Sequence, residues 1–154
     1  MSYWLMKTEP SAFSIEDLAR APHATTSWDG VRNFQARNML RDQMKKGDLA
    51  FLYYSGIDVP GIAAVMEIVK EGHPDLTAFD RKHHHYDADS DPKSPRWFMV
   101  DVKLKARLSR IITLEELRLH AAKELKGMML LRPGNRLSVS PVDAAHWKFI
   151  RSLE

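Results

Sequence analysis

Residues 98–108 read FMVDVKLKARL, and the rest of the chain can be organised around this stretch. Apolar side chains at the even positions, from Phe98 to Leu108, alternate with a mainly charged set at the odd positions. A period of two is typical of a β-strand that has one buried side and one side in solvent. Strands of parallel sheets are usually buried on both sides, so the pattern favours an antiparallel or barrel strand.

Shorter elements are predicted on either side. Strands are expected at 3–7, 49–54, 62–70 and 136–139 from short aromatic and β-branched runs bounded by turn residues. Helices are expected at 15–20, 34–46, 121–131, after Thr113, and after Ser140 with Pro141 in the first turn. Five or six strands with short helices, and no regular βαβ alternation, indicate an α+β fold with a small curved sheet or barrel.

Composition narrows the class of protein. With 154 residues, 44% of them hydrophobic and 28% charged, residues 1–154 are expected to form a single globular domain. The absence of cysteine excludes a disulfide scaffold, a thiolate zinc site and a cysteine nucleophile. A net charge of +3 permits a polyanionic partner without requiring one. No apolar run is long enough for a membrane span, so we expect no membrane partner. The lack of cysteine fits a reducing compartment, so we expect a cytoplasmic location.

The least regular stretch is 72–96, where three histidines at 83–85 precede Asp87, Asp89 and Asp91. The aspartate spacing imitates a calcium loop, but Pro92 and Phe98 stand where that loop needs Gly and Glu. Three adjacent histidines cannot all face one ion from a regular helix or strand. We therefore expect a solvated loop, with no metal and no cofactor.

Lys7, Thr8 and Glu9 place an amine, a hydroxyl and a carboxylate in a row at a strand end. Such a group suits a lysine-activated threonine nucleophile, although a strand end with a surface ion pair is more common. The usual hydrolase and nucleotide-binding motifs are missing from the chain. We expect no catalytic residues.

Basic side chains recur one helical turn apart at Arg37, Arg41 and Lys45, with Arg32 just upstream. This spacing fits contacts to nucleic-acid phosphates. A solvated helix face is the alternative.

Two tryptophans lie outside the periodic apolar pattern. Trp97 falls in register with the wet face of the 98–108 strand, and Trp28 lies in a turn-rich segment. Together they suit a pocket in which a flipped base stacks. Burial in the core or at an interface is the competing interpretation.

Several motifs in order resemble the EVE-domain family over residues 2–152. They are YWLMKTEP at 3–10, WDGVRNFQARN at 28–38, GD at 47–48, YYS at 53–55, GIA at 61–63, PRW at 95–97 and RLSV at 136–139. The resemblance implies a PUA-like fold, a mixed β pseudo-barrel surrounded by short helices and related to YTH and ASCH domains. It also implies an aromatic cavity that holds a modified base. Tyr54 replaces a histidine that the family usually shows before Ser55, so the modification read is left open.

Carried onto this chain, the resemblance assigns two groups of residues. The cavity would comprise Trp28, Asp29, Val31, Arg32, Asn33, Phe34, Tyr54, Ser55 and Trp97. Flanking phosphates would contact Arg32, Arg37, Arg41 and Lys45.

The function expected is a non-enzymatic reader of a modified, methylated base in DNA or RNA. The first alternative is an ASCH-like hydrolase that acts on a nucleobase or nucleoside through Lys7 and Thr8. A second alternative is a domain that binds a small molecule or a protein. The compact chain resembles bacterial members of the family, which implies a bacterial location in the cytoplasm, with association with the nucleoid as an alternative. The sequence leaves the oligomeric state open.

Overall fold

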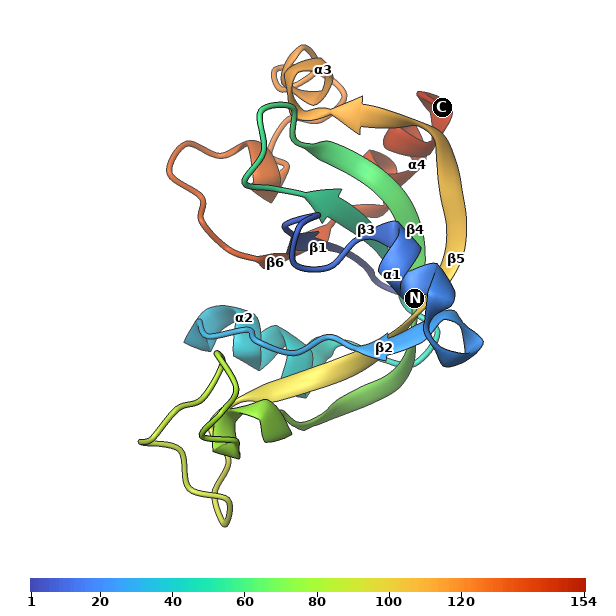
Figure 1. Cartoon of the computed structure of the whole chain (residues 1–154). Helices are drawn as coiled ribbons and strands as arrows, with labels where there is room; N and C mark the ends of the chain where they lie inside the picture. The colour runs from blue at the N-terminus through green and yellow to red at the C-terminus, as the bar shows by residue number, and fades with distance from the viewer.

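Six strands form one mixed sheet in the computed structural model, which describes residues 1–154 (Figure 1). The strands are β1 (Tyr3–Thr8), β2 (Thr25–Ser27), β3 (Leu49–Tyr54), β4 (Gly61–Pro74), β5 (Phe98–Thr113) and β6 (Val139–Val142). Their order is β2-β5-β4-β3-β1-β6, with β1 and β3 parallel and every other pair antiparallel. The two edge strands do not pair, so the sheet is not closed. The predicted α+β class is confirmed.

The sheet is curved because its two longest strands are bulged. The pairing of β4 with β5 shifts register four times, between Ile62 and Ala64 and at three later points. Each bulge adds local bend and twist to a strand. Figure 1 shows both strands sweeping around the molecule, so that β1 and α2 face each other across the concave side. The predicted strand at 98–108 continues to Thr113.

Short helices connect the strands. They are α1 (Ile15–Arg20), α2 (Phe34–Asn38), α3 (Leu114–Arg118) and α4 (Ala144–Ser152), with single turns η1 (Pro22–Ala24), η2 (Met39–Gln43), η3 (Leu76–Phe79) and η4 (Met129–Leu131). The predicted capping box opens α1, since the Ser14 side chain and the Asp17 side chain each accept the other residue's amide. None of the helices reaches the length and apolar character that crossing a bilayer requires.

Four predictions of the type or bounds of an element are wrong. The helix expected at 34–46 ends at Gln43: α2 passes into the π-helical turn η2, and the backbone of Met44 is extended. The helix expected at 121–131 is a series of turns, with only η4 helical. The last strand is 139–142 rather than 136–139, and it contains the proline expected to begin a helix. An edge strand tolerates proline because one of its sides has no partner strand.

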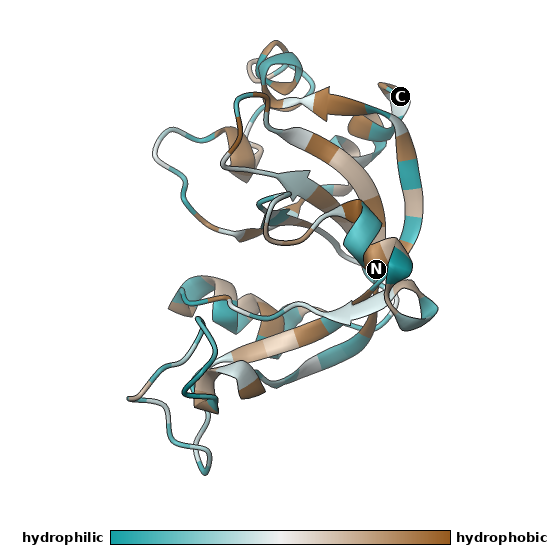
Figure 2. Cartoon of the chain, viewed as in Figure 1, coloured by the Kyte–Doolittle hydropathy of each residue, from teal (hydrophilic) through white to brown (hydrophobic).

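Apolar side chains cover both faces of the sheet. Along β1, Trp4 and Met6 enter one hydrophobic cluster and Leu5 enters the other. In β3, Leu52 and Phe51 divide in the same way, because successive side chains point to opposite faces. In Figure 2, brown segments recur along the strands, whereas the loop formed by residues 80–96 is mostly teal and white.

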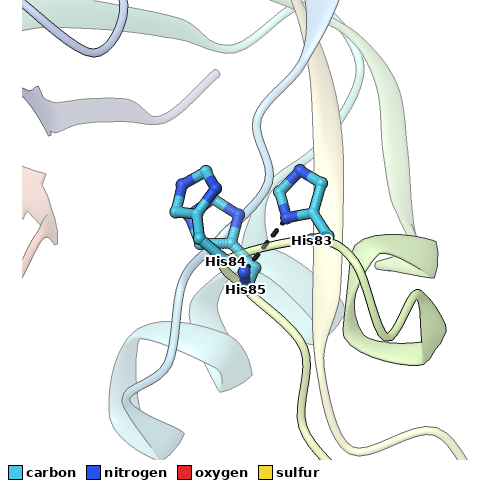
Figure 3. Close-up of side chains that lie close together, drawn as sticks. All are labelled: His83, His84 and His85. Atoms are coloured by element: carbon cyan, nitrogen blue, oxygen red, sulfur yellow. Dashed lines mark hydrogen bonds between the residues drawn. The ribbon is translucent and has the colours of Figure 1, made fainter.

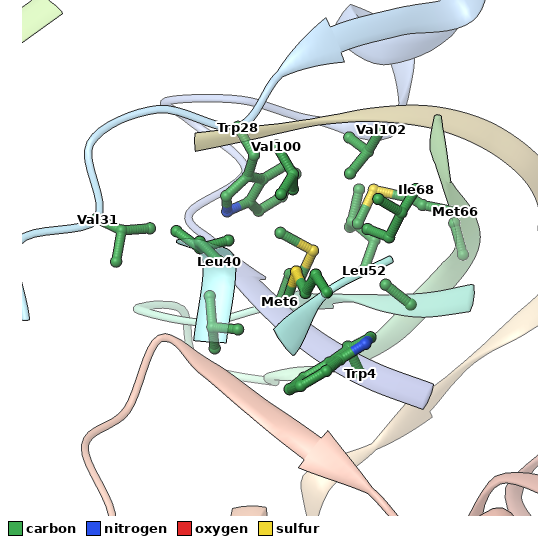
Figure 4. Close-up of a cluster of buried hydrophobic side chains, with 14 of the residues drawn as sticks. Trp4, Met6, Trp28, Val31, Leu40, Leu52, Met66, Ile68, Val100 and Val102 are labelled. Atoms are coloured by element: carbon green, nitrogen blue, oxygen red, sulfur yellow. The ribbon is translucent and has the colours of Figure 1, made fainter. Parts of the chain in front are cut away.

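One of these clusters supports the segment that follows β2. Trp28 and Val31 pack into it beside Leu40, Val100 and Met6 (Figure 4). The segment 28–33 is therefore irregular in backbone but fixed in place by buried side chains.

Candidate functional site

A pocket of about 430 Å³ opens between the end of β1, the end of β2 and the histidine turn. Its lining residues are Lys7, Thr8, Ala12, Phe13, Thr26, Ser27, Trp28, Asp29, His83, His84 and His85. We call this site the Trp28 pocket. Its volume lies in the range of small-molecule sites, about 300–1,000 Å³.

Trp28 is one of the apolar residues that line the pocket, with Ala12 and Phe13. Its side chain packs edge-on against Phe13, with the ring centroids 6.2 Å apart, and its amide donates to the Val100 carbonyl at 2.8 Å. The indole is therefore fixed by the sheet below and by a neighbouring ring. A fixed aromatic face gains free energy when it covers a ligand methyl group, at about 0.8 kcal/mol per buried carbon.

Lys7 and Thr8 bring an amine and a hydroxyl to the same pocket. Burial lowers the pKa of the Lys7 ammonium, and its Nζ lies 6.0 Å from the centre of the Tyr53 ring. The Thr8 hydroxyl donates to the Phe13 carbonyl at 3.0 Å. An activated nucleophile requires a base that accepts the proton of its hydroxyl. The Thr8 hydroxyl donates to a backbone carbonyl instead, so it is not activated in this way.

Asp75 anchors the wall that carries Asp29. Its carboxylate is fully buried and accepts hydrogen bonds from the Gly30 amide at 2.8 Å, from Arg32 at 3.0 Å and from Thr77. Burial alone would raise the pKa of Asp75, but the bonds from Thr77, Gly30 and Arg32 outweigh it and hold the pKa below its ordinary value. Asp75 is therefore ionised at neutral pH and joins the 28–32 segment to η3.

Arg32 joins the same wall to the histidine turn. Its Nη2 donates to the His85 carbonyl at 2.7 Å, while Nη1 contacts Asp75. Gly30, at φ +80°, lies under the His85 ring, and a Cβ there would stand 2.3 Å from Cε1. Glycine is required at position 30 by both its backbone conformation and the imidazole above it.

The three histidine rings lie together in the turn (Figure 3). Their centroids are 3.9–4.8 Å apart, and His83 Nδ1 accepts the His85 amide at 3.0 Å. His85 Nδ1 is buried without a hydrogen-bond partner and lies 3.8 Å from Asp29 Oδ1. Burial lowers the pKa of His85 despite that carboxylate.

Trp97 does not line the Trp28 pocket. Its ring stacks on Phe34 at 4.8 Å, lies 5.4 Å from the Arg32 guanidinium, and donates from Nε1 to Asp87 at 2.6 Å. We call these four residues the Trp97 cluster. Phe34 is 52% exposed, so the cluster presents an aromatic face to solvent.

Four other predicted cavity residues make contacts within the fold. Val31 is buried in the core, and the Asn33 side chain accepts the Ala36 amide at 3.0 Å as the N-cap of α2. The Tyr54 hydroxyl accepts the Ile15 amide at 2.9 Å, and the Ser55 amide donates to the Thr8 carbonyl. Their assignment to a binding cavity stays a prediction.

The predicted phosphate-binding side chains already have protein partners. Arg37 donates to the Arg96 carbonyl at 2.6 Å and lies 5.0 Å from the Phe34 ring. Arg41 pairs with Asp42 at 2.8 Å, and Lys45 lies 4.0 Å from Glu71. The pairs of Arg41 and Lys45 are largely exposed, and exposed ion pairs contribute little free energy. Phosphate binding by these side chains stays a prediction.

Of the predicted cavity residues, the structure places only Trp28 and Asp29 on the pocket wall. Sequence reasoning did not assign Ala12, Phe13, Thr26 or Ser27 to the site, and no local pattern marks them. The sequence indicates Lys7 and Thr8 as a candidate nucleophile pair and the histidines as candidate metal ligands, rather than as parts of a base pocket. Their meeting depends on long-range folding, since β1 and the turn at 83–85 are far apart in sequence.

The fold is that of a small α+β domain with a pocket beside the end of β1, and comparison gives the family. The EVE domain matches residues 2–153, so the chain belongs to the EVE-domain family. It is 46% identical over 167 residues to human thymocyte nuclear protein 1, covering 99% of this chain and 74% of that protein.

Two solved structures have the same fold. Human THYN1 protein in complex with DNA containing 5-methylcytosine superposes with a TM-score of 0.94 at 44% identity, over 99% of this chain and 97% of that one. A protein from Pseudomonas syringae has a TM-score of 0.92 at 41% identity, over 99% of both chains. An ASCH protein from Zymomonas mobilis, at 10% identity and a TM-score of 0.56, shares the fold alone.

Proposed function

We propose that this chain binds nucleic acid carrying a methylated base, and that the base enters the Trp28 pocket. One observation carries the proposal: human THYN1, whose structure was solved with DNA containing 5-methylcytosine, matches this fold over 99% of the chain. The pocket supports it from the chain's own side, with an aromatic wall, an anion and several hydroxyls around about 430 Å³. We extend the proposal to residues 1–154 acting as one cytoplasmic domain.

The pocket chemistry suits a methylated cytosine. The Trp28 face would cover the methyl group, and the Asp29 carboxylate would accept a hydrogen bond from the amino group of the base. Aspartate is a common acceptor for the cytosine N4 amine. Thr26 and Ser27 line the same pocket and offer further polar contacts.

The Trp97 cluster supports a second role for the predicted residues. Phe34 is exposed and stacked on Trp97, with the Arg37 guanidinium 5.0 Å from its ring. We propose that Phe34 stacks on a flanking base while Arg32, Arg37, Arg41 and Lys45 contact phosphates. Neutralising phosphates releases counterions, so affinity should fall as salt rises.

The hydrolase alternative has one observation in its favour, since Lys7 and Thr8 both line the pocket. Against it, the Thr8 hydroxyl donates to a backbone carbonyl and has no base beside it. We propose that the chain is not an enzyme and that these residues contact the bound base. Incubation with methylated nucleosides should give no product.

The experiment is a fluorescence-anisotropy titration of two oligonucleotide duplexes that differ only in one cytosine methyl group. Wild-type protein should bind the methylated duplex more tightly. Asp29→Asn should weaken that binding about 5- to 150-fold, equivalent to 1–3 kcal/mol for one base-edge contact. Asp58→Asn is the matched control, because Asp58 is exposed in the β3–β4 loop. Equal binding of both duplexes by wild type would contradict the proposal.

A further inference from the structure

We propose that His83, His84 and His85, supported by Asp29, bind a divalent transition-metal ion such as Zn²⁺ at the wall of the Trp28 pocket. The sequence favours a solvated loop because adjacent residues of a regular helix or strand point in different directions. The structure removes that objection, since the histidines occupy a turn. The His83 amide bonds to Asp80 and the Tyr86 amide bonds back to His83, at 2.9 and 3.0 Å.

The spacing of the imidazoles is close to that of a metal site. One ring nitrogen from each histidine lies within 4.8 Å of the others. In a tetrahedral zinc site with Zn–N bonds of about 2.1 Å, ligand nitrogens are about 3.4 Å apart. Side-chain rotations that bring the ring nitrogens about 1.4 Å closer would give this ligand spacing. The His84 side chain is exposed, so it can turn without displacing a buried residue.

A second, independent observation is the environment of His85. Its Nδ1 is the one buried side-chain nitrogen or oxygen in the protein that lacks a hydrogen bond. Asp29 Oδ1 lies 3.8 Å from that atom. Metal-bound histidines usually donate their other ring N–H to a carboxylate, which orients the ring. Coordination through His85 Nε2 would place a proton on Nδ1, next to Asp29.

The turn is held in place without an ion. Arg32 donates to the His85 carbonyl at 2.7 Å, and buried Asp75 fixes Arg32. Such pre-organisation lowers the entropic cost of binding. His83 differs from its neighbours because its Nδ1 already accepts the His85 amide. Coordination by His83 breaks that bond through either ring nitrogen, because coordination through Nε2 leaves a proton on Nδ1, so His83 should contribute less than His84 and His85.

The test is calorimetric titration of the full chain with ZnCl₂. We expect one ion per chain, and binding at least tenfold weaker in His84→Gln and His85→Gln. His83→Gln should have a smaller effect. Asp29→Asn should weaken binding about 10- to 100-fold, the usual effect of losing a carboxylate partner. His23→Gln is the control, since His23 is exposed and far from the turn in sequence.

A titration in urea separates a folded site from chelation by any three adjacent histidines. The proposal requires the folded protein to bind Zn²⁺ more tightly than the unfolded chain. Equal affinity in both states would overturn it, as would the absence of saturable binding to the folded protein. His84→Gln keeps the test decisive even if His85→Gln is unstable, because the exposed His84 side chain makes no hydrogen bond that the fold needs.

Discussion

Trp28 and Trp97 are buried to nearly the same extent, at 7% and 6% exposed, yet they occupy different surroundings. Trp28 meets one ring edge-on and lines a pocket. Trp97 is stacked on Phe34, lies near Arg32, and is bonded to Asp87. Burial alone therefore does not identify a tryptophan that can hold a ligand. The free space beside the ring distinguishes the two.

The largest effect is expected at Asp75, which serves both regions through Gly30 and Arg32. Asp75→Asn replaces a buried acceptor of several hydrogen bonds with a group that must also donate. We expect this change to lower the free energy of unfolding by about 2–4 kcal/mol, because it disturbs several buried hydrogen bonds. The loss is limited because partly exposed Arg32 can reach water. Urea denaturation measures it, with Asp58→Asn as the control. A loss below about 0.5 kcal/mol, typical of a surface site, would contradict this role.

Gly30 tests the Trp28 pocket alone. Gly30→Ala places a methyl group 2.3 Å from the His85 ring at φ +80°, whereas Gly134→Ala has φ +74° and no atom within 4 Å. Both variants incur backbone strain of about 1–2 kcal/mol. Gly30→Ala should be less stable than Gly134→Ala by about a further 1 kcal/mol, because the imidazole must move. Equal thermal unfolding of the two variants would show that the histidine turn is not held over Gly30.

Phe34 tests the Trp97 cluster alone. Phe34→Ala should weaken binding to methylated and unmethylated oligonucleotides equally. The expected loss of binding free energy is about 1–2 kcal/mol, the contribution of one base stack. The loss of stability should stay below about 1.5 kcal/mol, because the ring is 52% exposed and the stack on Trp97 is the main contact that it loses. Leu119→Ala, at another exposed apolar residue, is the control. Loss of methyl discrimination in Phe34→Ala would move the base site to this cluster.

The smallest effect concerns pH. The Trp97 indole and the Asp89 amide hold the pKa of Asp87 below its ordinary value. The folded carboxylate is therefore harder to protonate than the unfolded one, and it contributes stability above the ordinary pKa of about 4. That contribution is lost as pH falls through the lowered pKa. Asp87→Asn should show a flatter decline of stability between about pH 5 and 3. An unchanged profile would contradict the contribution of Asp87.

Local patterns predicted most of the sheet. The run at 49–54 matches β3 residue for residue, and the alternation from Phe98 predicted β5. Both patterns report directly which side chains are buried. The errors arise where tertiary packing overrides local preference. Leu125 and Met128 are buried from a chain of turns, with Gly127 at φ +84° between them.

The candidate site was less predictable than the fold. Family motifs located Trp28 and Asp29, but they also indicated Trp97, which the structure stacks under Phe34. Phe13 and the histidine turn lie beside the pocket because the curved sheet brings distant segments together. No spacing in the sequence indicates that arrangement. The predicted basic residues were found with partners already in place.

The most direct test compares Trp28→Phe with Trp97→Phe on the methylated and unmethylated duplexes. The central claim is that the methylated base is held beside Trp28. Trp28→Phe should reduce the ratio of the two affinities, because less aromatic surface covers the methyl group. Trp97→Phe should weaken both affinities together and leave the ratio unchanged. A ratio that is lost in Trp97→Phe and kept in Trp28→Phe would contradict the claim.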